Sequence, residues 1–250
     1  TKEGFKYKNK FIKFLSKRDP KDLPWKKYKV DVVLDCSGMF TSKEKASAHI
    51  SAGAKKVIIS APGSNVDATI VQGVNNQILT KKHSIISNGS CTTNCLAPVA
   101  MVIDKGIGIE NGFMTTIHSY TGDQRSVDHA HNDFRRARAA AISMIPTSTG
   151  AAKALSLVLP KLKGKLDGTA IRVPTPNVSL IDFTFTSKKK TSVEKINELV
   201  IKASNSKKLK NILTTNDLPL VSIDFNHNSS SSVFDLTQTQ VINEKFCRIL

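Results

Sequence analysis

The sequence from residue 30 to residue 60 reads VDVVLDCSGMFTSKEKASAHISAGAKKVIIS. It opens with an apolar run rich in β-branched residues, residues 30–36, which predicts a strand. Thr41 and the Ser-Lys-Glu after it have the form of a capping box, so we expect a helix that ends at Gly53. Residues 56–60 predict a second strand. A strand, a helix and a strand in this order favour a parallel α/β sheet.

The pattern changes along the chain. Before residue 91 we expect further strands at residues 5–16, 71–74 and 84–87. After it we expect a helix over residues 96–103, longer strands at residues 113–118 and 178–186, a polar loop over residues 119–143 and a helix over residues 191–203. We therefore predict an α/β fold in which residues 1–90 are the C-terminal part of a Rossmann-like, doubly wound dinucleotide-binding domain. Residues 91–250 are predicted to be an α+β catalytic domain with a mixed or antiparallel sheet.

Composition narrows the class of protein. The 250 residues are 40% hydrophobic, which allows a sizeable core, and the four cysteines are too few for a disulfide scaffold. No run approaches the roughly 20 apolar residues of a membrane span, and the first residues show no secretory pattern. We expect a soluble cytoplasmic protein. The net charge of +17 favours anionic ligands, but aromatic residues make up only 6% of the chain, so we favour a lysine-rich surface over a nucleic-acid site.

The clearest chemical signal surrounds Cys91. The stretch SNGSCTTNC, residues 87–95, lies between a strand candidate and a helix candidate, which places Cys91 in the first turn of a helix. There the helix dipole and the free N–H groups favour a thiolate and can receive an oxyanion. His118 closes a strand candidate and could take the proton of the thiol. Taken alone, a cysteine at a helix start is more often structural than catalytic. We interpret the second cysteine, Cys95, as a packing residue.

The segment SCTTNCLAP, residues 90–98, closely resembles the active-site segment of the phosphorylating, bacterial-type glyceraldehyde-3-phosphate dehydrogenases. The similarity extends through residues 18–25, 57–62, 118–124, 146–154, 172–178 and 222–226. Compared with this family, the chain lacks the first βαβ part with its glycine fingerprint GxGxxG, as well as a C-terminal strand and helix. The resemblance therefore implies a chain truncated at both ends, and we expect such a fragment to be inactive.

The resemblance implies a catalytic pair. Cys91 would attack the aldehyde of D-glyceraldehyde 3-phosphate to form a thiohemiacetal, with His118 as base. Hydride transfer to NAD would leave a thioester, which inorganic phosphate would cleave to 1,3-bisphosphoglycerate, a step of glycolysis and gluconeogenesis. No metal is implied.

Two phosphate sites and a cofactor site follow from the same resemblance. Thr121 and Arg172 would bind the phosphate of the substrate. The attacking phosphate would be bound by Ser90, Thr92, Arg135, Thr149 and Gly150. The cofactor contacts expected within this chain are Ser37, Gly38, Ser60 and Ala61, which follow two of the predicted strands. The residues after Asp128 are smaller than those that many NAD-specific members carry at this place. NADP therefore remains an alternative to NAD as the cofactor.

Other functions compete with this interpretation. Erythrose-4-phosphate dehydrogenase shares the cysteine and the histidine, but the threonines at residues 121, 147 and 149 favour the triose substrate. A cysteine hydrolase or acyltransferase would also use a Cys–His pair but would need no nicotinamide. A nucleic-acid-binding protein would bind in a salt-dependent manner that Cys91→Ala leaves unchanged. The family further implies a homotetramer in which the loop of residues 119–143 packs toward a neighbouring subunit.

Overall fold

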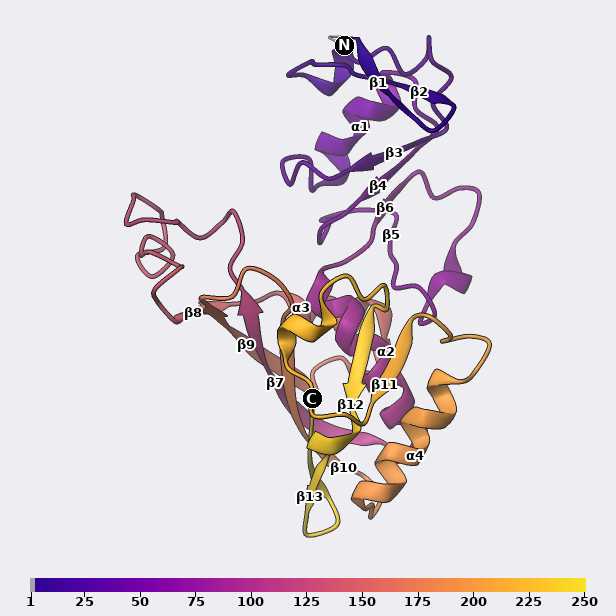
Figure 1. The fold of residues 1–250 in the computed structure, drawn as a ribbon. Coiled ribbons are helices and arrows are strands. Elements are labelled where there is room, and N and C mark those ends of the chain that lie inside the picture. The colour runs from indigo at the N-terminus through magenta and orange to yellow at the C-terminus, as the bar shows by residue number, and fades with distance from the viewer. Residues whose placement is uncertain (1–2) are drawn as a thin grey trace. The chain divides into compact units, whose positions relative to one another are not determined.

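The computed structural model describes residues 3–250, which form two compact units (Figure 1). The first unit runs to Ile70 and includes Ile78–Gly89, and the second consists of Val71–Gln77 and Ser90–Leu250. Among the residues that the structure describes, no helix is both long and apolar enough to cross a membrane.

A four-stranded parallel sheet with strand order β3-β4-β6-β5 organises the first unit. Its strands are β3 (Val32–Asp35), β4 (Lys56–Ile59), β5 (Ala68–Thr69) and β6 (Ile85–Ser87). The hairpin of β1 (Gly4–Tyr7) and β2 (Lys10–Lys13) precedes it, followed by the short 3-10 helix η1 (Pro20–Asp22). Helix α1 (Lys43–Ser51) connects β3 to β4, and a second 3-10 turn, η2 (Asn76–Ile78), precedes β6. This parallel arrangement confirms the predicted α/β class.

Helix α1 begins one residue later than the sequence suggested. Its N-cap is Ser42, not Thr41, and the Ser42 hydroxyl accepts a hydrogen bond from the N–H of Lys45 at 3.3 Å. The buried side chain of Ala46 packs with Val57 and Ile59 in a small core between the helix and the sheet. The helix thus covers the sheet where the apolar strands need burial.

Two polar side chains, Asp67 and Ser87, tie the strand ends of this unit together. The Asp67 carboxylate accepts hydrogen bonds from the N–H groups of Ser84 and Ile85 at 2.7 and 2.9 Å and pairs with Lys43 at 2.6 Å. The Ser87 hydroxyl, which is fully buried, donates to the carbonyl of Ala61 at 2.7 Å. It also accepts from the N–H groups of the two glycines at 63 and 89, at 3.0 and 3.1 Å.

A six-stranded mixed sheet with strand order β13-β14-β10-β7-β9-β8 forms the base of the second unit. Its strands are β7 (Ile109–Ser119), β8 (Ile145–Ser148), β9 (Leu166–Val173), β10 (Leu180–Ser187), β13 (Gln240–Ile242) and β14 (Phe246–Ile249). Only the pairing of β7 with β9 is parallel within this sheet. The predicted mixed sheet is confirmed.

Helices and a two-stranded parallel sheet cover this base. The helices are α2 (Cys91–Gly106), α3 (Ala151–Val158) and α4 (Val193–Ser204), and the additional strands are β11 (Leu213–Asn216) and β12 (Ser232–Asp235). Short 3-10 turns η3 (Pro160–Leu162), η4 (Ser222–Phe225) and η5 (Leu236–Gln238) link these elements. Apolar residues of α2 such as Ile103 pack with Met114 of β7, Phe183 of β10 and Leu155 of α3 in one continuous core.

The strand predicted at residues 71–74 is wrong. This stretch is a turn, in which the N–H of Val74 donates to the carbonyl of Val71 at 3.1 Å and the N–H of Val71 donates to the Asn75 side chain at 2.8 Å. Val71 and Val74 are apolar because they pack in the core of the second unit, so the residues are buried without pairing in a sheet.

Candidate active site

Cys91 is the first residue of α2. Ser90 is the N-cap of this helix, and its hydroxyl accepts a hydrogen bond from the N–H of Thr93 at 3.0 Å. This capping positions the exposed Cys91 thiol at the helix N-terminus, where unpaired N–H groups and the helix dipole stabilise negative charge. The placement predicted from the sequence agrees with this geometry.

His118 lies near the end of β7, on the face of the sheet that also carries Met114 and Thr116. All three side chains are buried, as the two-residue period of a strand requires. The Nε2 atom of His118 lies 3.3 Å from the Sγ atom of Cys91, so a hydrogen bond joins the imidazole to the thiol. The two residues are 27 positions apart in the sequence, and only the packing of α2 on the sheet brings them together.

The imidazole changes the acidity of the thiol. Its hydrogen bond to Sγ lowers the pKa of Cys91 from 9.0 to about 7. Burial of the sulfur opposes this shift, while the charge of His118 and hydrogen bonds from the backbone and hydroxyl of Thr92 lower the pKa further. A large fraction of Cys91 is therefore a thiolate near neutral pH, which is the nucleophilic form.

Arg172 lies beside the histidine because β7 and β9 pair in a register that places His118 opposite Arg172. Its NH1 group donates to the carbonyl of Ser119 at 2.9 Å and lies 2.8 Å from the Nδ1 atom of His118. The Nδ1 atom is itself 2.7 Å from the same carbonyl. When Nδ1 carries the proton and donates it to the Ser119 carbonyl, Arg172 donates to that carbonyl and not to Nδ1. In this tautomer Nε2 can accept the proton of the thiol.

The Arg172 guanidinium is only partly hydrogen-bonded within the described chain. Its Nε atom is buried and has no hydrogen-bond partner among residues 3–250. Burial lowers the pKa of Arg172, and the charge of Cys91 opposes this shift. Thr121 follows β7 by two residues, and its N–H and hydroxyl both donate to the Gln124 side chain at 3.0 and 3.1 Å. A buried donor without a partner is what a phosphate-binding arginine would present.

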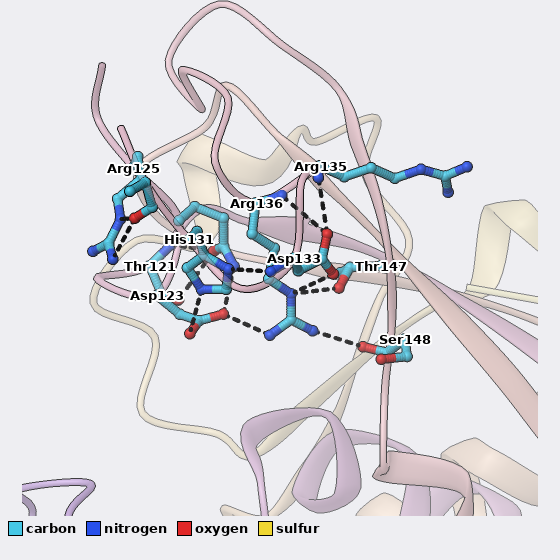
Figure 2. Close-up of polar contacts among 11 residues, drawn as sticks. Thr121, Asp123, Arg125, His131, Asp133, Arg135, Arg136, Thr147 and Ser148 are labelled. Atoms are coloured by element: carbon cyan, nitrogen blue, oxygen red, sulfur yellow. Dashed lines mark hydrogen bonds and ion pairs between the residues drawn. The ribbon is translucent and has the colours of Figure 1, made fainter. Parts of the chain in front are cut away.

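An arginine cluster lies in the loop of residues 119–143, in which no helix or strand follows the end of β7 at Ser119. Figure 2 shows the Arg136 side chain reaching toward β8, while Arg135 extends away from this group. Arg136 donates to the Asp123 carboxylate at 2.7 Å, to the Thr147 hydroxyl at 2.8 Å and to the carbonyl of Ser148 at 3.5 Å. The family resemblance implies Arg135 for the phosphate site, and the sequence pattern does not distinguish it from the adjacent Arg136.

The other predicted phosphate-binding residues lie at helix starts. Thr149 and Gly150 precede α3, with Gly150 as its N-cap and the Thr149 hydroxyl accepting from the N–H of Ala151 at 3.2 Å. Ser90 and Thr92 flank the nucleophile at the start of α2. The N-terminus of a helix offers N–H groups and a positive dipole to an anion.

The four predicted cofactor contacts follow two parallel strands of the first unit. Ser37 and Gly38 come after β3, and Ser60 and Ala61 come after β4. Gly38 has a φ of 72°, and a side chain built on it would meet no atom within 4 Å, so the backbone of this turn is open to a ligand. Open turns at the carboxyl ends of parallel strands are where doubly wound domains bind dinucleotides.

Comparisons with known proteins agree with this geometry. A family model described as the C-terminal domain of glyceraldehyde 3-phosphate dehydrogenase matches residues 90–250, and the NAD-binding domain of the same family matches residues 1–43.

The chain belongs to the glyceraldehyde 3-phosphate dehydrogenase family.

Individual members of the glyceraldehyde 3-phosphate dehydrogenase family are closely similar over nearly the whole chain. The glyceraldehyde-3-phosphate dehydrogenase of Xanthobacter flavus is 59% identical over 239 residues, which cover 96% of this chain and 71% of the relative. The chromosomal glyceraldehyde-3-phosphate dehydrogenase of Cupriavidus necator is 55% identical over 240 residues, with the same coverage. Glyceraldehyde-3-phosphate dehydrogenase 2 of Bacillus subtilis is 52% identical over 242 residues.

Membership of the glyceraldehyde 3-phosphate dehydrogenase family confirms three predictions made from the sequence. The resemblance to this family is confirmed, and so is the order of an NAD-binding part followed by a catalytic part. NAD is the cofactor that the matched N-terminal domain of this family binds. The chain is thus an NAD-dependent oxidoreductase by family.

Proposed function

We propose that this protein oxidises glyceraldehyde 3-phosphate and phosphorylates the product to 1,3-bisphosphoglycerate, with Cys91 as nucleophile. The observation that supports this proposal most directly is the hydrogen bond of 3.3 Å between Cys91 and His118 at the start of α2. A thiol with a pKa of about 7 beside an imidazole is suited to attack an aldehyde carbon.

The residues of the chain account for the steps in order. The Cys91 thiolate forms a bond to the aldehyde carbon, and Nε2–H of His118 donates to the oxygen that becomes negative. NAD supplies the acceptor for the hydride that leaves this carbon. As the carbonyl re-forms, His118 accepts the hydroxyl proton, and a thioester on Cys91 remains. Inorganic phosphate then attacks the thioester, the carbon–sulfur bond breaks, and the Cys91 thiolate is restored.

Two groups of residues are proposed to bind the two phosphates. Arg172, with its buried and unpaired Nε, and Thr121 would bind the phosphate of the substrate. Ser90, Thr92, Thr149 and Gly150 would bind the attacking phosphate. We propose Arg136 as the fifth residue of this second site. It takes the place of Arg135, because Arg136 contacts the strand that leads into Thr149.

The proposal includes assembly into homotetramers through the loop of residues 119–143 and the segment that follows it. This region exposes large apolar side chains: Phe134 is 88% exposed, Ile142 83% and Met144 75%. Apolar surface of this kind on a loop is typical of an interface. A cytoplasmic location is also proposed, supported by four cysteines that are all free thiols.

Formation of the reduced nicotinamide tests the activity. The full-length protein is mixed with glyceraldehyde 3-phosphate, phosphate and NAD, and absorbance of the reduced cofactor is followed. We expect Cys91→Ser to abolish the signal and Cys247→Ser to retain it, because Cys247 lies in β14 and is buried in the core. Absence of reduced cofactor with the wild-type protein, or turnover of acyl esters without NAD, would contradict the proposal. Erythrose 4-phosphate, offered in competition, tests the choice of substrate.

A further inference from the structure

Asp35, the last residue of β3, contacts both turns that are proposed to bind the cofactor. Its Oδ1 atom accepts hydrogen bonds from the N–H and the hydroxyl of Ser37, at 3.0 and 2.7 Å. Its backbone carbonyl accepts from the N–H of Ser60 at 3.0 Å. Asp35 is only 6% exposed, so one buried residue fixes the start of each turn.

His49, in the last turn of α1, lies behind Asp35. Its Nε2 atom is 3.4 Å from Oδ2 of Asp35, an oxygen that is buried and has no hydrogen bond of good geometry within the described chain. Its Nδ1 atom accepts a hydrogen bond from the indole N–H of Trp25 at 3.1 Å. Because Nδ1 is an acceptor, the ring proton of neutral His49 is on Nε2 and faces Asp35.

The position of His49 is fixed by packing as well as by polar contacts. The ring of Phe40 contacts the imidazole edge-on, with 5.9 Å between centroids, and His49 itself is 6% exposed. Trp25 is held in turn by its own backbone carbonyl, which accepts from the N–H of Val30 at 3.1 Å. Indole, imidazole and carboxylate therefore form one chain of contacts that ends at the Ser37 turn, with His49 and Asp35 buried.

We propose that Asp35, His49 and Trp25 are positioning residues for the nicotinamide dinucleotide. They touch neither substrate nor cofactor, and they act by holding the turns of Ser37–Gly38 and Ser60–Ala61 in the geometry that binds it. A turn that is ordered before the ligand arrives loses less entropy on binding, which strengthens affinity. This inference rests on the proposed function, since it takes those four residues as the cofactor contacts.

Asp35→Asn tests the first link. The amide of Asn has an oxygen that accepts and an NH2 group that donates hydrogen bonds. If its oxygen stays on Ser37, its NH2 group faces the Nε2–H of His49, and two donors meet. If the amide is flipped, the hydrogen bonds from Ser37 are lost. We expect the Kd for NAD, measured by calorimetry on the intact protein, to rise about ten-fold, as loss of a hydrogen bond to a charged group implies. The turnover number at saturating NAD and the alkylation rate of Cys91 should change less than about two-fold.

Asp31→Asn is the matched control. Asp31 also lies in the first unit, but its side chain is 70% exposed and pairs with Lys55 at the surface. The Asp31→Asn substitution removes the same charge as Asp35→Asn without touching either turn. The Kd of this variant for NAD should therefore equal that of the wild type.

A pair of substitutions at His49 separates positioning from bulk packing. The side-chain amide of His49→Gln can reach the place of Nε2 and donate to Asp35, whereas that of His49→Asn can only replace Nδ1. We expect His49→Gln to bind NAD more tightly than His49→Asn. Trp25 is the one tryptophan of the chain, so its fluorescence reports directly on loss of the indole hydrogen bond in His49→Gln.

Each outcome points to a different conclusion. Unchanged NAD affinity in Asp35→Asn, with a folded protein and normal Cys91 alkylation, would overturn the positioning role. Equal loss of affinity in the two His49 variants would also overturn it, because packing alone would then explain the effect. Failure of the wild-type protein to bind NAD would instead contradict the proposed function.

Discussion

At the scale of single residues, the acidity of Cys91 depends chiefly on His118. We expect His118→Asn to raise the pKa of the thiol from about 7 toward 9.0, because the largest cause of the shift is removed. At pH 7 the rate of alkylation by iodoacetamide should then fall roughly ten- to fifty-fold, since only the thiolate reacts. The pH profile of alkylation measures this midpoint directly. His129→Asn, an exposed loop histidine, is the control, and a midpoint that stays near 7 in His118→Asn would contradict the assignment.

The two adjacent arginines of the loop should differ sharply in function. Arg136→Lys loses the paired contacts to Asp123, Thr147 and Ser148, because an ammonium group cannot reproduce the planar fork of a guanidinium. We expect the KM for inorganic phosphate to rise about ten-fold, as loss of one charge-assisted hydrogen bond implies. Arg135→Lys should leave it unchanged. Equal effects of the two substitutions would show that the proposed choice of Arg136 is wrong.

The sequence supported some site residues better than others. Cys91 could be placed at a helix start from its neighbours, but its pairing with His118 depends on how α2 packs on β7, and no local pattern encodes that packing. The contact of His118 with Arg172 depends on the register of two parallel strands that are separated in the chain. Only the family resemblance carried that information before the structure did.

At the scale of elements, Asp67 joins α1, β5 and β6. Its contacts with Lys43 and with two backbone N–H groups lower its pKa from 3.8 to about 2, the hydrogen bond from Ile85 being the largest cause. The folded-state pKa lies below the unfolded one, so the stabilisation is present above pH 3.8 and is lost as the pH falls toward 2. We expect Asp67→Asn to cost about 2 kcal/mol at neutral pH, from about 1.4 kcal/mol for each pKa unit.

Urea unfolding of the wild type and of Asp67→Asn measures this cost. The difference between them should shrink as the pH is lowered from about 4 toward about 2, where the wild-type carboxylate loses its advantage. Asp31→Asn, which breaks only a surface pair with Lys55, should change stability by well under about 1 kcal/mol. A pH-independent difference for Asp67→Asn would contradict the electrostatic explanation.

Elements with regular patterns were predicted well. The strand after residue 30, helix α1, β4 and helix α4 all form close to where the sequence pattern predicts them. In β4 and α4 the buried side chains are apolar, whereas Val32 and Leu34 of β3 are exposed. The turn at residues 71–74 was mistaken for a strand, since apolar side chains alone do not distinguish burial by a core from pairing in a sheet. Strand β9 was missed. Its Gly168 sits so close to Met114 that a Cβ atom would lie 2.6 Å from the Met114 carbonyl, a demand that only the neighbouring strand explains.

At the scale of the whole molecule, the exposed apolar side chains of the loop predict association. We expect Phe134→Lys to shift the protein toward smaller species at a given concentration, because a charge at an 88% exposed apolar position would have to be desolvated in an interface. Analytical ultracentrifugation across a range of concentrations checks this result. Ile201→Lys, on the surface of α4, should leave the assembly unchanged. An unchanged distribution in Phe134→Lys would argue against this loop as the interface.

The hydroxyl of Ser87 restricts which substitutions the fold tolerates around it. Ala at this position would leave one carbonyl and two N–H groups without their partner, at about 1–3 kcal/mol for each group. Position 63 is constrained from the other side, since a Cβ there would lie 3.0 Å from that of Ser87 and 2.7 Å from a methyl of Val66. A substitution at position 63 cannot compensate for a substitution at position 87, nor the reverse. In a library selected for folded protein, we therefore expect Gly63 and Ser87 to be retained together, while the surface lysines of the domain vary freely.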